Sequence, residues 1–275
     1  MIEILKAILF GIVEGITEWL PISSTGHMIL LNDFIHLSVS EEFYELFEVV
    51  IQLGAILAVV VIYFKTICPI GFGKTKKETK DTLNLWGKII VACLPAAVIG
   101  ILFDDWLDEH LYNSIVVSLM LIIYGIIFIV IESRKVGTRK TKRLNNITYK
   151  QALGVGAFQL LSLIPGTSRS GATIIGGLLL GLERSVAAEF TFFLAIPVMA
   201  GASLLKVLKY ILKVGLVFNL SEVFLLIVGC VVAFIVSILI IKFLMNYIRK
   251  HDFKVFGYYR IVLGIIVLLY FVFLK

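Results

Sequence analysis

Six apolar segments of roughly membrane-spanning length constrain the fold of this chain more than any other feature of its sequence. They cover residues 41–64, 86–103, 113–132, 184–212, 221–245 and 254–274. A helix that crosses the hydrocarbon core of a bilayer needs about 20 mostly apolar residues. The chain is 60% hydrophobic and only 16% charged, whereas soluble domains carry about 25% charged residues. The sequence therefore predicts an all-α polytopic membrane protein.

Four shorter apolar segments are arranged in two pairs. They cover residues 3–20, 22–36, 150–164 and 168–182. Each pair is broken at a proline, Pro21 or Pro165, and proline interrupts the helical hydrogen-bond ladder. Irregular backbone at membrane depth is tolerated only where protein or a watery cavity surrounds it. We therefore predict two re-entrant helical hairpins besides the six spanning helices.

The two halves of the chain have the same order of segments, a hairpin followed by three spans. Pro21 and Pro165 are 144 residues apart, and this shift places Ser24 on Ser168, although few residues are identical. Because three is an odd number, the second hairpin must enter from the opposite face. This predicts an inverted-topology repeat with a binding site near the midplane. The predicted organisation is a single membrane domain, 1–275, whose parts are a first repeat, 1–132, a basic cytoplasmic loop, 133–149, and a second, inverted repeat, 150–275.

The basic residues indicate how the chain is oriented. The net charge of +6 comes mainly from Lys and Arg in the loops 65–88, 133–150 and 249–254. Cytoplasmic loops of membrane proteins carry such an excess, so we place these loops inside and expect the first hairpin to open outward. This distribution argues against a nucleic-acid partner. Three lysines at 206, 209 and 213 would lie near the outer face and weigh against this orientation.

A first polar run, residues 14–27, places carboxylates and a histidine in apolar sequence. Ionisable residues inside a membrane are costly and are functional candidates by default. Glu14 and Glu18 are four residues apart and share a helix face. That pair suits general acid/base catalysis or a divalent-cation site of oxygen ligands, for Mg²⁺ or Ca²⁺. The alternative is that both carboxylates lie at a hydrated helix end.

The hydroxyl residues Ser23, Ser24 and Thr25 follow the break at Pro21, where a half-helix would begin. Free backbone N–H groups at a helix N-terminus favour an anion, and one hydroxyl is expected to cap the helix. Ser24 is a candidate for substrate contact or nucleophilic attack, with His27 as its base. Two alternatives stay open: His27 as the nucleophile, or attack by a water that Glu18 orients.

A second polar run, residues 163–173, supplies the cation that the first lacks. Arg169 carries a planar, permanently charged fork suited to phosphate oxygens; its alternative role is to reach out of the membrane to water. Glycines at 166 and 171 allow close backbone approach. Two half-helix N-termini meeting at mid-membrane would hold a diphosphate from two sides. The expected substrate-binding residues are Ser23, Thr25, Gly166, Thr167, Ser168, Ser170 and Thr173.

Other polar residues within the apolar segments are weaker candidates. Glu48 and Gln52 share a face of the 41–64 segment, and Glu189 lies in the 184–212 segment. These three either line the site or bond between helices. Arg260 follows two tyrosines, a context typical of an anchor at the membrane interface.

Both runs resemble one known family. Residues 14–27 resemble the (E/Q)xxxE-plus-histidine motif of the undecaprenyl-diphosphate phosphatase family, the bacitracin-resistance proteins, and residues 165–173 resemble its PGxSRSxxT motif. The resemblance covers essentially the whole chain. It implies a membrane hydrolase that converts undecaprenyl diphosphate to the monophosphate and inorganic phosphate. Such an enzyme recycles the lipid carrier for peptidoglycan synthesis, and its activity is expected to confer bacitracin resistance.

The resemblance also implies site roles. Glu14 and Glu18 become catalytic or metal-associated, and Ser24 and His27 become nucleophile or acid/base candidates. The phosphate binders carried over from the second motif are Ser168, Arg169, Ser170 and Thr173. The family further implies an outward-facing active site in the bacterial cell membrane, a link to divalent cations and members that form dimers.

Two other functions are alternatives to hydrolysis of this lipid. A polyprenyl-phosphate transporter or flippase is one, because inverted repeats with broken helices are typical of transporters. Transport does not require a nucleophile beside a base, so the cluster around Ser24 favours hydrolysis. A lipid phosphatase of the phosphatidic-acid type is disfavoured, because the chain has neither its K-x6-R-P run nor its PSGH element.

Overall fold

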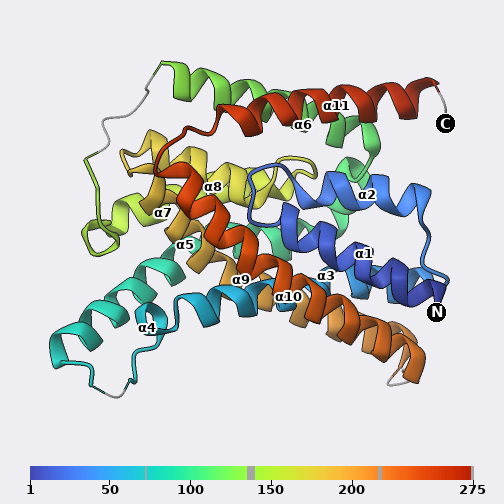
Figure 1. The fold of residues 1–275 in the computed structure, drawn as a ribbon, viewed down its shortest axis with the longest axis horizontal. Helices are drawn as coiled ribbons and strands as arrows, with labels where there is room; N and C mark the ends of the chain where they lie inside the picture. The colour runs from blue at the N-terminus through green and yellow to red at the C-terminus, as the bar shows by residue number, and fades with distance from the viewer. Residues whose placement is uncertain (72, 135–139, 216–218, 274–275) are drawn as a thin grey trace.

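Six long helices make up most of the molecule in the computed structural model (Figure 1), which describes residues 1–71, 73–134, 140–215 and 219–273. They are α3 (Glu41–Ile62), α5 (Lys76–Leu111), α6 (Ser114–Ser133), α9 (Arg184–Val214), α10 (Leu220–Ile248) and α11 (Lys254–Phe273). Each contains a stretch long and apolar enough to cross a membrane. The prediction of an all-α, polytopic membrane protein is therefore confirmed. Residues 135–139 of the predicted basic loop lie outside the described residues.

Four short helices lie where the two hairpins were predicted. They are α1 (Ile2–Thr17), α2 (Ser24–Phe34), α7 (Tyr149–Gln159) and α8 (Arg169–Leu179). Within each pair the two helices are in contact, and a 3-10 turn, Leu160–Leu163, follows α7. The breaks thus fall at the two proline-bearing runs, as predicted. Their re-entrant entry into a bilayer stays a prediction.

The start of α5 differs from the sequence-based expectation. Residues 65–88 were predicted to form a loop, but α4 (Phe64–Ile67) occupies its beginning and α5 starts at Lys76. Thr75 and Glu78 form a reciprocal capping box, in which each side chain accepts a hydrogen bond from the other residue's backbone N–H. A prediction from apolar residues alone places the start of this helix too late, because the first turns of α5 are polar and precede its apolar stretch. The capping box is the sequence signal for the true start.

The two loops resemble each other in backbone conformation, but the register predicted between them is off by one. Ser23 and Ser168 each have φ of 73°, and each side chain caps the following helix by accepting from the N–H three residues on. Ser168 therefore corresponds to Ser23, not to Ser24. The second loop is one residue longer between its proline and its serine, and Gly166 within it has φ of +88°. The halves are thus related by 145 residues at the site.

Helix packing crosses between the halves. The hairpin helix α1 packs on α10, while its counterpart α7 packs on α5, and α3 lies against α9. Helices α6 and α11 run together along one edge of the molecule (Figure 1). This exchange of partners agrees with a two-fold relation between the halves, and the inverted topology itself stays a prediction.

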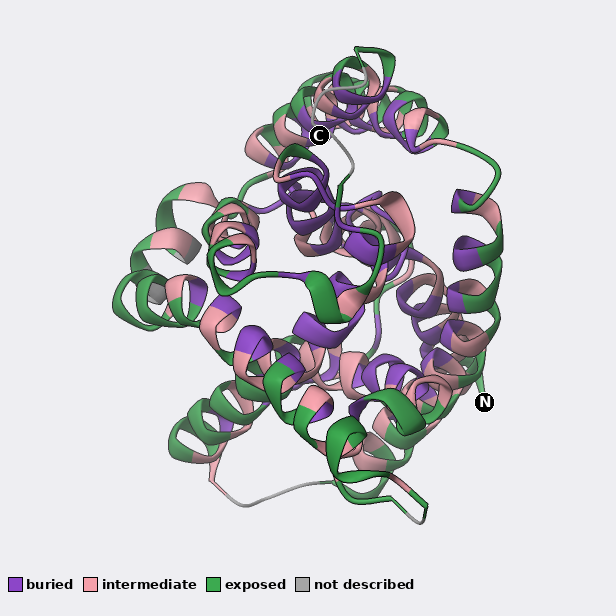
Figure 2. Ribbon diagram, turned by 90° about the vertical axis from the view of Figure 1, so that its left-hand side faces the viewer, coloured by how far each residue is buried: buried purple, intermediate pink, exposed green. Residues whose placement is uncertain are grey.

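Burial is distributed as a lipid environment requires. The helices turn their buried faces toward one another and their exposed faces outward (Figure 2), and the exposed faces carry large apolar side chains such as Leu57, Leu239 and Phe243. A close crossing of α1 and α10 depends on Gly15, where an added Cβ would come within 2.9 Å of the Ala233 carbonyl oxygen. Small residues at crossings are typical of helices that pack in membranes.

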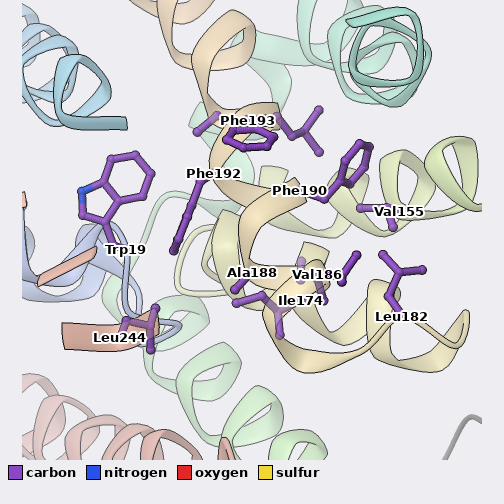
Figure 3. Packing of buried hydrophobic residues seen from close by; sticks show 14 of the residues in the cluster. Trp19, Val155, Ile174, Leu182, Val186, Ala188, Phe190, Phe192, Phe193 and Leu244 are labelled. Atoms are coloured by element: carbon purple, nitrogen blue, oxygen red, sulfur yellow. The ribbon is translucent and has the colours of Figure 1, made fainter. Parts of the chain in front are cut away.

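The core anchors the first loop. Trp19, which follows the candidate Glu18, is fully buried and packs edge-to-face on Phe192 of α9, with ring centroids 5.3 Å apart (Figure 3). Phe190 and Phe193 belong to the same buried cluster. The backbone beside the candidate carboxylate is therefore fixed by packing against the second half of the chain.

Candidate active site

The two polar runs meet in space although they are about 150 residues apart in sequence. Ser170, in the first turn of α8, is buried, and its hydroxyl lies 3.2 Å from the Glu18 carbonyl oxygen and 3.3 Å from that of Leu20. It lies within hydrogen-bonding distance of the Ser168 hydroxyl as well, at 3.1 Å. These contacts hold the start of α8 against the first part of the loop between α1 and α2.

The Glu18 carboxylate joins the two runs. Ser24 donates its hydroxyl to Oε2 of Glu18 at 2.9 Å, and Arg169 donates Nη2 to Oε1 at 2.6 Å. Hydrogen bonds between ionised partners are shorter and stronger than neutral ones. Only 8% of the Glu18 side chain is exposed, so each carboxylate oxygen is bonded by a residue of a different run in a mostly buried setting.

Arg169 is held inside the protein. Its side chain is 11% exposed, its Nη1 donates to the Thr191 carbonyl at 2.9 Å, and its Cζ lies 5.9 Å from the centre of the Trp19 ring. Nη2 also contacts the Met199 sulfur at 3.4 Å. The alternative of an arginine that reaches out to water is therefore wrong. The contacts fix the plane of a permanent cation at the site.

A cavity of about 170 Å³ opens beside this ion pair. Seven predicted site residues line it: Glu18, Ser24, Thr25, Gly166, Ser168, Arg169 and Ser170. Its other lining residues are Gln52, Ser162, Pro165, Val198, Met199 and Ala202. Gln52 was a weak candidate, whereas the apolar residues of α9 carry no polar signal in the sequence. Neither Glu48 nor Glu189 lines this cavity.

The electrostatics of the cavity favour an anion. Helices α2 and α8 both begin at its wall, since Ser24 and Arg169 are their first residues. Helix N-termini present free N–H groups and the positive end of the helix dipole. Together with the Arg169 guanidinium they make a cavity wall suited to phosphate oxygens, and phosphate binding there stays a prediction.

Three of the predicted binding residues are buried next to the site and do not face the cavity. Ser23 is buried and caps α2. Thr173 donates its hydroxyl to the Arg169 carbonyl at 2.9 Å and accepts one from Thr191 at 2.9 Å. Thr167 is fully buried, and its hydroxyl has no partner among the described residues. These three side chains do not line the cavity.

His27 lies apart from the nucleophile candidate. One of its ring nitrogens, Nδ1, donates to the Ser23 carbonyl at 2.7 Å, because a carbonyl can only accept. The other, Nε2, is 2.6 Å from the Tyr259 hydroxyl. The structure therefore does not bring His27 to Ser24, and the carboxylate of Glu18 is the base within reach of the serine.

Glu14 and Glu18 are poorly arranged to hold the divalent cation that the sequence predicted for them. Both oxygens of Glu18 are already bonded, and the described residues contain no group of three or more His, Cys, Asp or Glu that could hold a metal. Glu14 is fully buried, and neither of its carboxylate oxygens has a hydrogen-bond partner in the described part of the chain. No catalytic step at this site is therefore assigned to a cation.

Comparison with known proteins decides the family. A family model described as "Bacitracin resistance protein BacA" matches residues 7–266. The chain belongs to the BacA family. Both polar runs fall within the matched BacA region.

BacA-like relatives match the chain over nearly its whole length. A protein of Enterococcus faecalis is 61% identical over 98% of this chain and 97% of its own length. A protein of Desulfitobacterium hafniense is 60% identical over 98% and 97%, and one of Acetivibrio thermocellus is 56% identical over 98% of both. All three bear the name undecaprenyl-diphosphatase. The family that the sequence motifs indicated is thereby confirmed.

Proposed function

We propose that this chain is an undecaprenyl-diphosphatase, a membrane hydrolase that converts undecaprenyl diphosphate and water to undecaprenyl phosphate and inorganic phosphate. The names of its relatives give the substrate. The observation that carries the chemistry is the Glu18 carboxylate shared between the Ser24 hydroxyl and the Arg169 guanidinium at an anion-suited cavity.

In the first step we assign Ser24 as the nucleophile. Its oxygen attacks the terminal phosphorus, and its proton passes to Glu18, which already accepts its hydrogen bond at 2.9 Å. The bond between that phosphorus and the bridging oxygen breaks, and undecaprenyl phosphate leaves with the electron pair. Arg169 and the N-termini of α2 and α8 stabilise negative charge on the transferred phosphoryl group.

In the second step water removes the phosphoryl group from Ser24. Glu18, after releasing its first proton to solvent, accepts one from the water whose oxygen attacks phosphorus. The bond to the serine oxygen breaks, and Glu18 returns this proton to Ser24. Glu18 therefore serves as base and then as acid, the dual role expected of one group in a two-step displacement.

Several wider features belong to the same proposal. A divalent cation is implied only by the family resemblance, and it has no step in this mechanism, because Glu14 does not line the cavity and both Glu18 oxygens are already bonded. The enzyme lies in the bacterial cell membrane with its site facing outward, recycles the carrier for peptidoglycan synthesis and supports bacitracin resistance. A homodimer is expected from the family resemblance, although one copy supplies all the residues described here.

The proposal is tested by phosphate release from undecaprenyl diphosphate with purified enzyme in detergent. We expect Ser24→Ala to lose at least about a hundredfold in kcat, because a nucleophile is removed. The matched control is Ser118→Ala, which removes a fully buried serine whose hydroxyl returns to its own helix, to the Ser114 carbonyl. This control should keep wild-type turnover.

The same assay defines the contrary results. Near-normal turnover by Ser24→Ala would refute the nucleophile assignment and leave attack by water. No release by folded wild type, with or without Mg²⁺ or Ca²⁺, would refute the phosphatase function.

A second function, transport of polyprenyl phosphate, is favoured by one observation, the exchange of hairpin partners between the halves through α1 with α10 and α7 with α5. Such paired, broken helices are typical of transporters. Translocation of a labelled polyprenyl phosphate across vesicles by folded Ser24→Ala would support transport as a separate activity. Vesicles in which the lipid stays in one leaflet would remove it.

A further inference from the structure

Arg260, in the second turn of α11, is fully buried and outside the catalytic cavity. It was expected from the sequence to be an anchor at the membrane interface, and that expectation is wrong. The guanidinium extends into the protein, to the backbone of the two loops that precede α2 and α8. No carboxylate pairs with it among the described residues, so the structure holds a buried cation that the mechanism above does not use.

The loop contacts are made to backbone carbonyls. Arg260 donates Nη1 to Pro21 at 3.2 Å. It donates Nη2 to Gly166 at 2.8 Å and to Thr167 at 3.0 Å. Pro21 lies two residues before the cap of α2, and Thr167 directly precedes the cap of α8. One side chain therefore bonds both half-helix starts that form the cavity.

Further contacts fix the arginine itself. Its Nε lies 3.4 Å from the Leu121 carbonyl and its Nη2 3.3 Å from that of Met120, both in α6. Its Cζ lies 5.6 Å from the centre of the Tyr124 ring. Helix α11 packs mainly on α6, so the guanidinium connects this helix pair to both loops.

A buried arginine without a carboxylate is costly, and it persists only where its donors are satisfied. Here carbonyl oxygens satisfy them, and some of these oxygens belong to loop residues outside any helix. Proline-broken loops have few hydrogen bonds of their own, because proline provides no N–H and the turn at Ser23 and Ser168 interrupts the helical ladder. The guanidinium replaces bonds that these loops lack.

We propose that Arg260 is a positioning residue that locks the two loops to each other and so holds Ser24 and Glu18 in register with Arg169. This inference rests on the proposed function. Arg260 does not line the cavity and acts through the loop backbone. An ammonium group has no planar fork, so a lysine at this position bonds fewer of the carbonyls at once.

The test compares Arg260→Lys and Arg260→Met with wild type in kcat, KM, melting temperature and hydrogen exchange. We expect folded Arg260→Lys to lose between about tenfold and a hundredfold in kcat, because small misplacements of reacting groups are costly. Its melting temperature should stay close to that of wild type. Amide exchange should rise in segments 18–25 and 164–170 together, while α10 stays protected as before.

The matched control is Arg184→Lys, which changes an arginine that donates Nε and Nη2 to buried Glu132 away from the cavity. It should keep the wild-type kcat and the wild-type exchange of both loops. If wild type and Arg184→Lys both release phosphate, the proposed function holds whatever the Arg260 variants do. The exchange measurement tests the inference about Arg260 without depending on activity.

Three results would overturn the inference. The first is an Arg260→Lys enzyme with wild-type kcat. The second is a kcat loss with unchanged exchange in the loops, or with exchange raised throughout the chain. The third is failure of both Arg260 variants to fold, which would make the residue a requirement of the fold and not a positioning group.

Discussion

Individual residues at the site adopt conformations that the surrounding protein must enforce. Ser23 and Ser168 both have φ of 73°, in the left-handed region that non-glycine residues seldom occupy, and such strain concentrates at functional sites. Each serine turns the chain so that the next residue, Ser24 or Arg169, begins a helix at the cavity. The sequence identified both serines as candidates, but hydroxyl type alone does not reveal which one caps and which one faces substrate.

The neighbouring Gly166 gives a direct test at this scale. It has φ of +88°, and an added Cβ would lie 2.5 Å from the Val117 carbonyl oxygen. We predict that Gly166→Ala destabilises the protein by roughly 1–3 kcal/mol or more, from backbone strain plus this clash, and lowers kcat. Thermal unfolding in detergent and phosphate release measure the two effects. Gly201→Ala is a control, because its Cβ meets nothing within 4 Å and its φ is ordinary; equal stability of the two variants would contradict the argument.

Among the elements, the helices were largely predictable and their contacts were not. Among the described residues, apolar length and the two prolines located the six long helices and the four hairpin helices, but not α4. Periodicity is a local property, whereas the position of Arg260 depends on how α11 and α6 meet the loops, so its role was missed. The same limit applies to His27, whose partner Tyr259 is 232 residues away.

The capping box of α5 allows a prediction about the stability of one helix that does not involve the candidate active site. Thr75→Ala removes a side chain that caps the Glu78 N–H, and we expect a loss of about 1 kcal/mol in stability. Turnover should be unchanged, because Thr75 does not line the cavity and its hydroxyl bonds to Glu78. Thermal unfolding with kcat from the same preparation provides the comparison. A large fall in kcat without loss of stability would show that the start of α5 has a functional role.

For the whole molecule, the decisive feature is that the site belongs to neither half alone. Glu18 and Ser24 come from the first half and Arg169 from the second, while Trp19 packs on Phe192 across the same boundary. The motifs indicated that the two runs cooperate. The direct ion pair between them depends on tertiary packing, which local residue patterns do not reveal.

The most direct test of this account is a double-mutant cycle on phosphate release with Glu18→Gln and Arg169→Lys. If the two residues act as one unit, each single variant loses at least about a hundredfold in kcat/KM. The double variant then has nearly the same kcat/KM as the less active single variant. Effects that multiply in the double variant, or near-normal turnover in either single, would contradict a shared site built from both loops.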